Sequence, residues 1–257
     1  MQVNLLGQVH GAKAALPHLR RRGGAFIAVS SMGARRSIPL QTAYCASKHG
    51  IDGFLESLRV ELEHDGVPVS VTQVLPATID TPLFDNARTR IGTKPTAPPP
   101  AYPARVVADA VVHAAGHPVR DLVIGGSAKT LLTAQAVAPR AVDVLLRRFG
   151  HPLHDTGEPK PAGAPDNLDA PLTRNDTVDG SIGGITVRGS AYTWWEVHRP
   201  VTAVVRAVGG PVASLARRLV PGPVATTVTS VLERAVRPTA AGRPSRTDSG
   251  VRARSVR

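Results

Sequence analysis

Three polar residues, Ser31, Tyr44 and Lys48, have side chains of the types that can exchange a proton with a carbonyl group or donate a hydrogen bond to it. Tyr44 and Lys48 lie four residues apart in a segment with helical periodicity, so both side chains leave the same face, one turn apart. A neighbouring ammonium stabilises a phenolate and is expected to lower the pKa of the tyrosine from about 10 toward working pH. Tyr44 is therefore a candidate general acid or base for a carbonyl or an alcohol.

Ser31 ends the apolar run of residues 25–31, which has the pattern of a buried parallel strand. Such a strand delivers its last side chain into the crevice at the carboxyl edge of the sheet, where a hydroxyl can donate to a developing alkoxide. The neighbouring Ser30 is expected to point to the opposite side of the strand. Taken alone, Tyr44 and Lys48 also fit a half-buried tyrosine with a lysine stretched along the surface.

The first 130 residues alternate between helical and strand-like segments. The expected helices cover residues 3–22, 44–66 and 104–116, and the expected buried strands cover residues 25–31, 67–76 and 121–126. The proline-rich residues 77–103 are expected to form a long loop without regular structure. This order predicts an α/β fold, the C-terminal half of a doubly wound, Rossmann-type parallel sheet.

The chain is expected to divide into residues 1–150, the partial α/β domain, and residues 151–257, a partly disordered, helical extension. The first part ends with one further helix over residues 130–150. Residues 151–190 are rich in Pro, Gly, Asp and Asn and predict an extended, poorly packed arm. Residues 198–236 predict short amphipathic helices, and a basic, disordered tail follows them.

The net charge of +12 suggests a nucleic-acid partner, but the distribution of the charge argues against one. Arginine is spread along the chain, and aromatic residues make up only 4%, so no basic surface with stacking aromatics is expected. No run of about eighteen uncharged apolar residues predicts a spanning helix, and no secretory signal is recognisable. Two alternatives stay open for residues 198–236: contact with an anionic membrane surface, or helices that fold back on the protein.

The single cysteine, Cys45, excludes an intramolecular disulfide and fits a reducing compartment, so a cytoplasmic location is expected. The histidines within the expected helices have no cysteine or carboxylate at metal-ligand spacing. No metal site is therefore expected.

Four motifs, in order and at matching spacing, resemble those of the short-chain dehydrogenase/reductase family. Asn4-Leu5-Leu6-Gly7 looks like the Asn-x-x-Gly motif of that family, and Ser31 precedes Tyr44 by thirteen residues, as in the family. The other two are Tyr44-Cys45-Ala46-Ser47-Lys48, which matches Tyr-x-Ala-Ser-Lys, and Pro76-Ala77-Thr78-Ile79-Asp80-Thr81, which resembles the cofactor loop Pro-Gly-x-Val-x-Thr. The resemblance covers residues 4–81.

The resemblance implies an NAD(P)-dependent oxidoreductase that moves a hydride between a nicotinamide cofactor and a secondary alcohol or ketone. Tyr44 would exchange the proton with the substrate oxygen, and Lys48 would lower the pKa of Tyr44. Ser31 would polarise the substrate oxygen. Asn4 would anchor a water molecule in the proton relay; an ordinary residue at the start of a helix is the alternative.

The resemblance also implies the residues that contact the cofactor, either NAD or NADP. Lys48 would hold the hydroxyls of the nicotinamide ribose beside Tyr44. Pro76 begins the loop after the second strand, where the backbone of Ile79 would bind the nicotinamide carboxamide. Thr81 would contact the carboxamide or a phosphate, or would only cap the turn that follows it.

The family binds its dinucleotide with a glycine-rich turn and a charged residue that both precede the Asn motif. Because that motif begins here at Asn4, we expect an N-terminally truncated member that lacks the nucleotide-binding half. Three explanations stay open: an upstream half that belongs to the working protein, a remnant without activity, or a non-catalytic chain that pairs its open sheet edge with another chain. Without the signature glycines, NAD cannot be told from NADP.

Residues 82–103, with Phe84 and Tyr102, resemble the variable substrate lid of the family. The segment is apolar and stiffened by proline, which suggests a hydrophobic carbonyl or alcohol substrate. The helices that begin near residues 1 and 44 are those with which the family pairs its subunits. A homo-oligomer is therefore what the resemblance implies.

Overall fold

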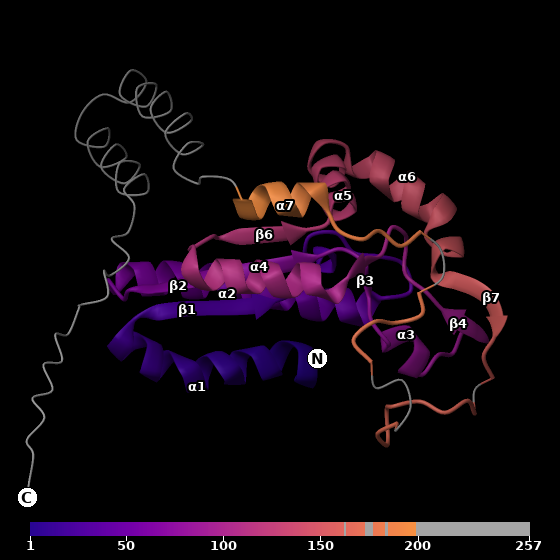
Figure 1. The fold of residues 1–257 in the computed structure, drawn as a ribbon, viewed down its shortest axis with the longest axis horizontal. Coiled ribbons are helices and arrows are strands. Elements are labelled where there is room, and N and C mark those ends of the chain that lie inside the picture. The colour runs from indigo at the N-terminus through magenta and orange to yellow at the C-terminus, as the bar shows by residue number, and fades with distance from the viewer. Residues whose placement is uncertain (162, 173–176, 183–184, 199–257) are drawn as a thin grey trace, which may run out of the picture. The chain divides into compact units, whose positions relative to one another are not determined.

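In the computed structural model, parallel strands form a central sheet, which among the described residues has the order β1-β2-β6 (Figure 1). β1 (Gly24–Val29) pairs along its length with β2 (Val69–Pro76), and β2 pairs on its other side with β6 (Asp121–Ile124). Both faces of β2 are covered, which explains its apolar and β-branched composition. The predicted buried strands and their parallel arrangement are confirmed.

The structure describes residues 1–161, 163–172, 177–182 and 185–198. The helices predicted over residues 198–236, apart from His198, and the predicted basic tail lie outside the described residues. Met1–His198 form one compact unit, and the predicted domain boundary at residue 150 stays a prediction. Within the described part of the chain, no helix has the length and the apolar character that crossing a membrane requires.

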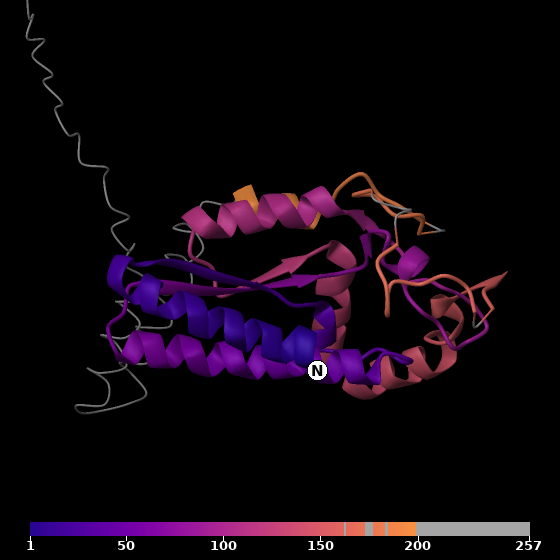
Figure 2. The ribbon, with the colours of Figure 1, turned by 90° about the horizontal axis from the view of Figure 1, so that it is seen from below.

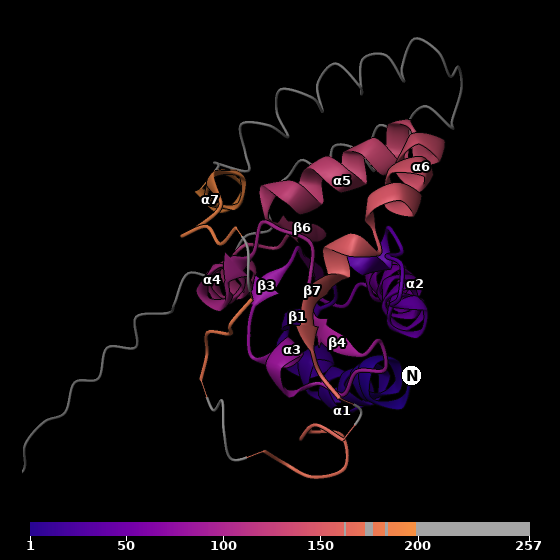
Figure 3. The same ribbon diagram turned by 90° about the vertical axis from the view of Figure 1, so that its right-hand side faces the viewer.

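Helices cover both faces of the sheet (Figures 2 and 3). α1 (Gly7–Arg22) and α2 (Thr42–His64) lie on one face, and α4 (Ala104–Gly116) lies on the other. A π-helical turn, η1 (Gln2–Leu6), leads into α1. This layered arrangement confirms the predicted α/β, Rossmann-type fold class.

Apolar side chains on one face of α2 form the core against the sheet. Ile51, Leu55 and Leu62 are fully buried and pack with Val69 and Val71 of β2. Their spacing places them on one stripe of the helix. A second cluster joins α4 to the opposite face of the sheet; it contains Val74, Ala110, Ala114, Leu122 and Ile124.

Residues 77–103 contain short regular elements, so the expectation of a structureless loop is wrong. β3 (Ile79–Asp80) pairs in parallel with β5 (Tyr102–Pro103), and α3 (Leu83–Asn86) and β4 (Thr93–Pro95) lie between them in the chain. The prolines end the short strands β4 and β5, where a missing backbone N–H costs little. Proline content alone therefore did not exclude strands here.

Two helices replace the single one expected over residues 130–150. α5 (Gly126–Val137) and α6 (Pro139–Phe149) meet at Ala138, whose backbone has φ −139° and ψ 63°. Proline has no N–H to donate and disfavours the helical conformation in the residue before it. Pro139 therefore ends one helix and begins the next.

The described residues of the predicted arm, residues 151–190, are mostly exposed, in keeping with the predicted poor packing, but they contain short regular elements. A 3₁₀ turn, η3 (Pro152–His154), leads into β7 (Asp155–Pro159), which pairs antiparallel with β4. α7 (Ala191–His198), which the sequence analysis missed, contacts α4 and β6. There Thr193 Oγ1 accepts a hydrogen bond from Gly125 N at 2.9 Å. These partners are distant in sequence, so composition could not reveal them.

Replacing Leu55 by Ala should lower the free energy of unfolding by about 2–5 kcal/mol, because the fully buried side chain leaves a cavity between α2 and β2. Urea unfolding followed by circular dichroism measures the change. Val60→Ala on the exposed face of the same helix is the matched control, with an expected change within about 0.5 kcal/mol. Equal losses in the two variants would contradict the described core.

Candidate active site

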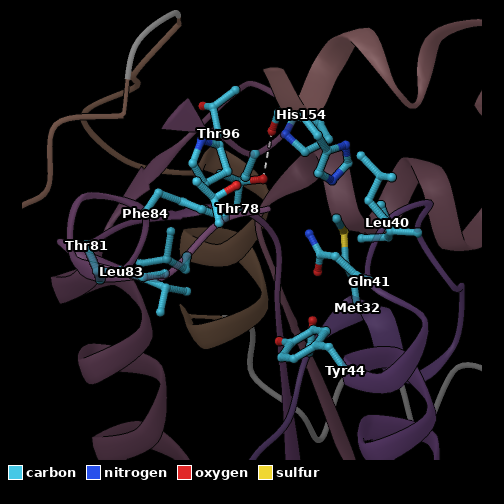
Figure 4. A pocket seen from close by; sticks show the side chains of 18 of the residues that line it. Met32, Leu40, Gln41, Tyr44, Thr78, Thr81, Leu83, Phe84, Thr96 and His154 are labelled. Atoms are coloured by element: carbon cyan, nitrogen blue, oxygen red, sulfur yellow. Dashed lines mark hydrogen bonds between the residues drawn. The ribbon is translucent and has the colours of Figure 1, made fainter. Parts of the chain in front are cut away.

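A cavity of about 760 Å³ lies at the carboxyl ends of β1 and β2 (Figure 4). Ser30 and Ser31 follow β1, Ala77 and Thr78 follow β2, and all four line the cavity. Segments that follow parallel strands converge at one edge of the sheet, which is where open α/β sheets bind ligands. Most of the wall is apolar; its larger apolar side chains are Met32, Ile38, Leu40, Leu83, Phe84 and Ile91. The volume suits a small organic molecule.

Tyr44 lies in the first turn of α2, and its half-buried side chain lines the cavity. Lys48, one turn later, lies with its Nζ 5.6 Å from the centre of the Tyr44 ring. The same Nζ donates a hydrogen bond to the carbonyl oxygen of Val29 at 3.3 Å. The helix thus brings the two side chains together, as the four-residue spacing predicts, and the end of β1 holds the ammonium.

Ser31 is buried beside Tyr44 and forms a side-chain hydrogen bond with it. Its Oγ accepts a hydrogen bond from Gly33 N at 3.0 Å, so its own proton is free to be donated. A Cβ at Gly33 would lie 3.3 Å from Ser31 Oγ and 3.4 Å from a ring carbon of Tyr44. The tight turn η2 (Met32–Ala34) therefore depends on a glycine that the sequence analysis did not single out.

Both Ser30 and Ser31 line the cavity, and the expectation that their side chains point to opposite sides stays a prediction. β1 ends at Val29, and Ser31 already caps the following 3₁₀ turn, so the alternation of a strand does not extend to these residues. Ser30 Oγ is buried and has no hydrogen-bond partner among the described residues.

The pKa of Tyr44 lies above its usual value, because burial disfavours the phenolate more than the hydrogen bond with Ser31 favours it. The sequence analysis predicted that the pKa of Tyr44 lies below its usual value. The pKa is raised instead, so that prediction is wrong in direction. Lys48 lies toward the ring and the carbonyl of Val29, and burial lowers the pKa of Lys48 as well. Tyr44 is consequently a neutral phenol near pH 7, the form that donates a proton.

Asn4 lies in η1 and does not line the cavity; its Nδ2 donates to Ser47 Oγ at 3.4 Å. Ser47 Oγ in turn donates to the carbonyl oxygen of Tyr44 at 2.6 Å. η1 approaches α2 closely at Gly50, where a Cβ would lie 2.8 Å from a methyl carbon of Leu5 and would move that side chain. The structure thus joins Asn4 to the turn of α2 that carries Tyr44.

The predicted cofactor loop borders the cavity. Pro76, Ile79 and Thr81 all line it, Pro76 as the last residue of β2 and Ile79 as the first of β3. A Cβ at Gly180 would lie 2.3 Å from the carbonyl oxygen of Thr81, so the arm crosses this loop at a glycine. The structure therefore brings together Ser31, Tyr44 and the loop, with Lys48 just behind Tyr44.

Residues of β4 and of the arm hold the apolar wall around α3 in place. Asp85 of α3 pairs with Lys94 Nζ at 2.8 Å and accepts a hydrogen bond from Ser181 N at 3.2 Å. Burial alone would raise the pKa of Asp85, but the hydrogen bonds from Lys94 and Ser181 outweigh it and keep that pKa below its usual value. Lys160 Nζ donates to the carbonyl oxygen of Ala87 at 2.8 Å. The arm thereby fixes the expected substrate lid.

Several polar residues of the cavity wall were not predicted as site residues, among them Gln41, Thr78, Thr96 and His154. Thr78 Oγ1 donates to the carbonyl oxygen of Pro98 at 2.7 Å, a bond drawn in Figure 4. His154 comes from η3, far along the chain, and Thr96 N donates to its carbonyl oxygen at 3.0 Å. No local pattern marks these residues, because distant segments bring them to the cavity.

Residues 1–92 match the family model described as short chain dehydrogenase. The uncharacterized oxidoreductase YxnA of Bacillus subtilis is 38% identical over 149 residues, which are 57% of this chain and 42% of that protein. A hydroxysteroid 11-beta-dehydrogenase 1-like protein of Xenopus tropicalis is 37% identical over 151 residues, 59% of this chain and 51% of that protein. Over residues 1–92 the chain is similar to the short-chain dehydrogenase/reductase family.

A crystal structure of a short chain dehydrogenase from Burkholderia cenocepacia in complex with NADP is 30% identical, with a TM-score of 0.48 and 56% of each chain covered. The chain spans about half the length of the curated short-chain dehydrogenase relatives that it matches. Every predicted site residue falls within the matched residues 1–92, whereas Thr96 and His154 fall outside them.

Replacing Ser31 by Ala should raise the pKa of Tyr44 further, because the hydrogen bond that favours the phenolate is lost. Alkaline titration followed by ultraviolet absorbance measures tyrosine ionisation, and subtracting the curve of a Ser31→Ala, Tyr44→Phe chain isolates Tyr44. Ser57→Ala, on the exposed part of α2, is the control and should leave the Tyr44 curve unchanged. A lower or unchanged pKa in Ser31→Ala would show that Ser31 does not stabilise the phenolate.

Proposed function

We propose that this chain carries the proton-transfer site of an NAD(P)-dependent oxidoreductase that interconverts a secondary alcohol and a ketone. The observation that carries the proposal is the phenol of Tyr44, hydrogen-bonded to buried Ser31 and facing a largely apolar cavity. A phenol and a second hydroxyl that converge on one point can both bind a carbonyl oxygen. The similarity of residues 1–92 to short chain dehydrogenases supports the same proposal.

In the reduction direction, Tyr44 donates its proton to the substrate oxygen as that oxygen becomes an alcohol. Ser31 donates a second hydrogen bond to the same oxygen and so stabilises the negative charge that develops there. In the oxidation direction, Tyr44 accepts the proton of the alcohol. Because burial keeps Tyr44 neutral, proton donation is the step for which the resting site is prepared.

The residues at the cavity fit the nicotinamide end of NAD or NADP. Ser30 presents a buried, unpartnered hydroxyl among the described residues, and Ile79 and Thr81 border the same space. Lys48 would hold the ribose hydroxyls, Pro76 would begin the loop beside the cofactor, and a bound nicotinamide would supply or accept the hydride. Asn4 positions the water of the proton relay through the Ser47 link to the Tyr44 turn.

The substrate is a small, largely apolar carbonyl or alcohol compound, in keeping with the wall formed by Met32, Leu83 and Phe84. The working protein is a cytoplasmic homo-oligomer that pairs through α1 and α2, the helices that the family uses for this contact. A peripheral contact with anionic membranes through residues 198–236 is the less favoured alternative.

A non-catalytic interaction protein is the second candidate function, and the open edge of β1 favours it. Among the described strands β1 pairs only with β2, so its other edge presents unpaired backbone groups to a further chain. In this case the partner strand completes the sheet, and the chain binds no dinucleotide by itself.

Fluorescence titration of the folded, monodisperse 257-residue chain with NADH and NADPH separates the two functions. Saturable binding is the result expected for the oxidoreductase, and the tighter of the two ligands identifies the cofactor. If a folded chain binds neither, the enzymatic proposal fails for this chain, and the interaction function is favoured.

Tyr44→Phe should lower the rate of NAD(P)H-dependent ketone reduction by about 10²–10⁴-fold, the usual contribution of a positioned acid. The fold and the dissociation constant of the cofactor should change little, since Phe keeps the ring that packs at the start of α2. Tyr192→Phe, whose ring does not line the cavity, is the matched control and should keep the rate of the unaltered chain. Undiminished turnover in Tyr44→Phe would remove Tyr44 from the reaction.

A further inference from the structure

Two buried polar atoms without partners lie on one part of the cavity wall. Thr96 Oγ1 and His154 Nε2 have no hydrogen-bond partner among the described residues, and both residues line the cavity. A backbone hydrogen bond of 3.0 Å from Thr96 N to the carbonyl oxygen of His154 holds the two segments together. Figure 4 shows both residues at one end of the cavity and Tyr44 at the other. Buried polar groups usually have partners, so a pair without them at a cavity points to a ligand.

The hydrogen bond of His154 Nδ1, the second ring nitrogen, determines which ligand group His154 Nε2 can bind. Nδ1 lies 2.7 Å from the carbonyl oxygen of Gly150, an acceptor, so a ring with a single proton carries that proton on Nδ1. Nε2 then has a lone pair and accepts a hydrogen bond from a ligand donor. The side chain is only 4% exposed, so the ring has little freedom to turn toward solvent.

We propose that Thr96 and His154 form a subsite for a hydroxyl group of the substrate, remote from the carbonyl that meets Tyr44. The ligand hydroxyl donates to His154 Nε2 and accepts a hydrogen bond from Thr96 Oγ1, which satisfies both orphaned atoms. The substrate is then an apolar ketone or secondary alcohol with a second hydroxyl at its far end. This inference rests on the proposed function for its account of the carbonyl end only.

The charges at the cavity favour a neutral hydroxyl over an ionic group. No acidic residue lines the cavity among the described residues, so a ligand cation would lack a counter-charge there. A carboxylate would face the lone pair of Nε2. Two arginines border the cavity. Arg88 is already paired with Asp166 at 2.7 Å and with Asp169, and Arg90 is exposed to solvent.

Calorimetric binding of two matched ketones to the purified 257-residue chain tests the subsite. 6-Hydroxy-1-tetralone has a distal donor, and 6-methoxy-1-tetralone has the same rings and carbonyl but only an acceptor there. We expect the hydroxy ketone to bind roughly tenfold more tightly, the effect of one net hydrogen bond. If water fills the subsite and satisfies both polar atoms, the two ketones bind with equal affinity. Equal affinities would overturn the proposal.

Variants at each end of the cavity assign the preference to its residue. His154→Asn keeps an N–H for the Gly150 carbonyl but has no group at the Nε2 position, so the preference should disappear. Thr96→Val should weaken binding of both ketones, because the Thr96 hydroxyl donates to the distal oxygen of either. Tyr44→Phe should also weaken both and leave the preference intact.

Equal binding by the unaltered chain, no binding of either ketone, or a preference that survives in His154→Asn would each refute the subsite. If His154→Asn fails to fold, the relative affinity of the two ketones for the unaltered chain still tests the subsite. Hydride transfer is measured separately. A hydroxyl preference without turnover leaves the subsite standing and removes the oxidoreductase, whereas Tyr44-dependent turnover without a preference does the reverse.

Discussion

The parallel pairing of β1 with β2 is the constraint on which the site depends. A parallel pair needs a crossover, because the chain must return from the carboxyl end of one strand to the amino end of the next. Here α2 makes that return, so its first turn begins at the carboxyl edge of the sheet. Tyr44 stands in that first turn, and Ser31 stands at the end of β1, so the topology itself brings the two hydroxyls together.

Close backbone contact determines how finely the two hydroxyls are placed. Gly33 lets the turn after β1 pass against both Ser31 and the ring of Tyr44, and Gly50 lets Leu5 pack directly on α2. The price of this packing is burial of the phenol, which raises its pKa against the effect of Ser31. Charge from Lys48 does not reverse that balance, since its ammonium is directed at the carbonyl of Val29.

Local sequence patterns were sufficient to predict the strands and helices around Tyr44 and the position of Ser31. Period and composition located the buried strands and the stripe of Leu55 and Leu62, and the thirteen-residue spacing selected Ser31, which does lie beside Tyr44. The predictions fail where the local pattern is overridden. Pro139 divides a helix that periodicity alone would continue. The roles assigned to these site residues stay predictions.

No local sequence pattern marks the proposed hydroxyl subsite, because pairing between distant segments creates it. Nothing near Thr96 or His154 in the sequence marks a site, and only the pairing of β4 with β7 carries η3 and the end of β4 to the same wall. Each of the proline- and glycine-rich segments, taken by itself, has the composition of a linker. Once paired, they present two polar atoms to a cavity whose reacting groups come from a different part of the chain. The chemistry at Tyr44 and the choice of substrate at His154 can therefore vary independently, since no element of the described structure carries both.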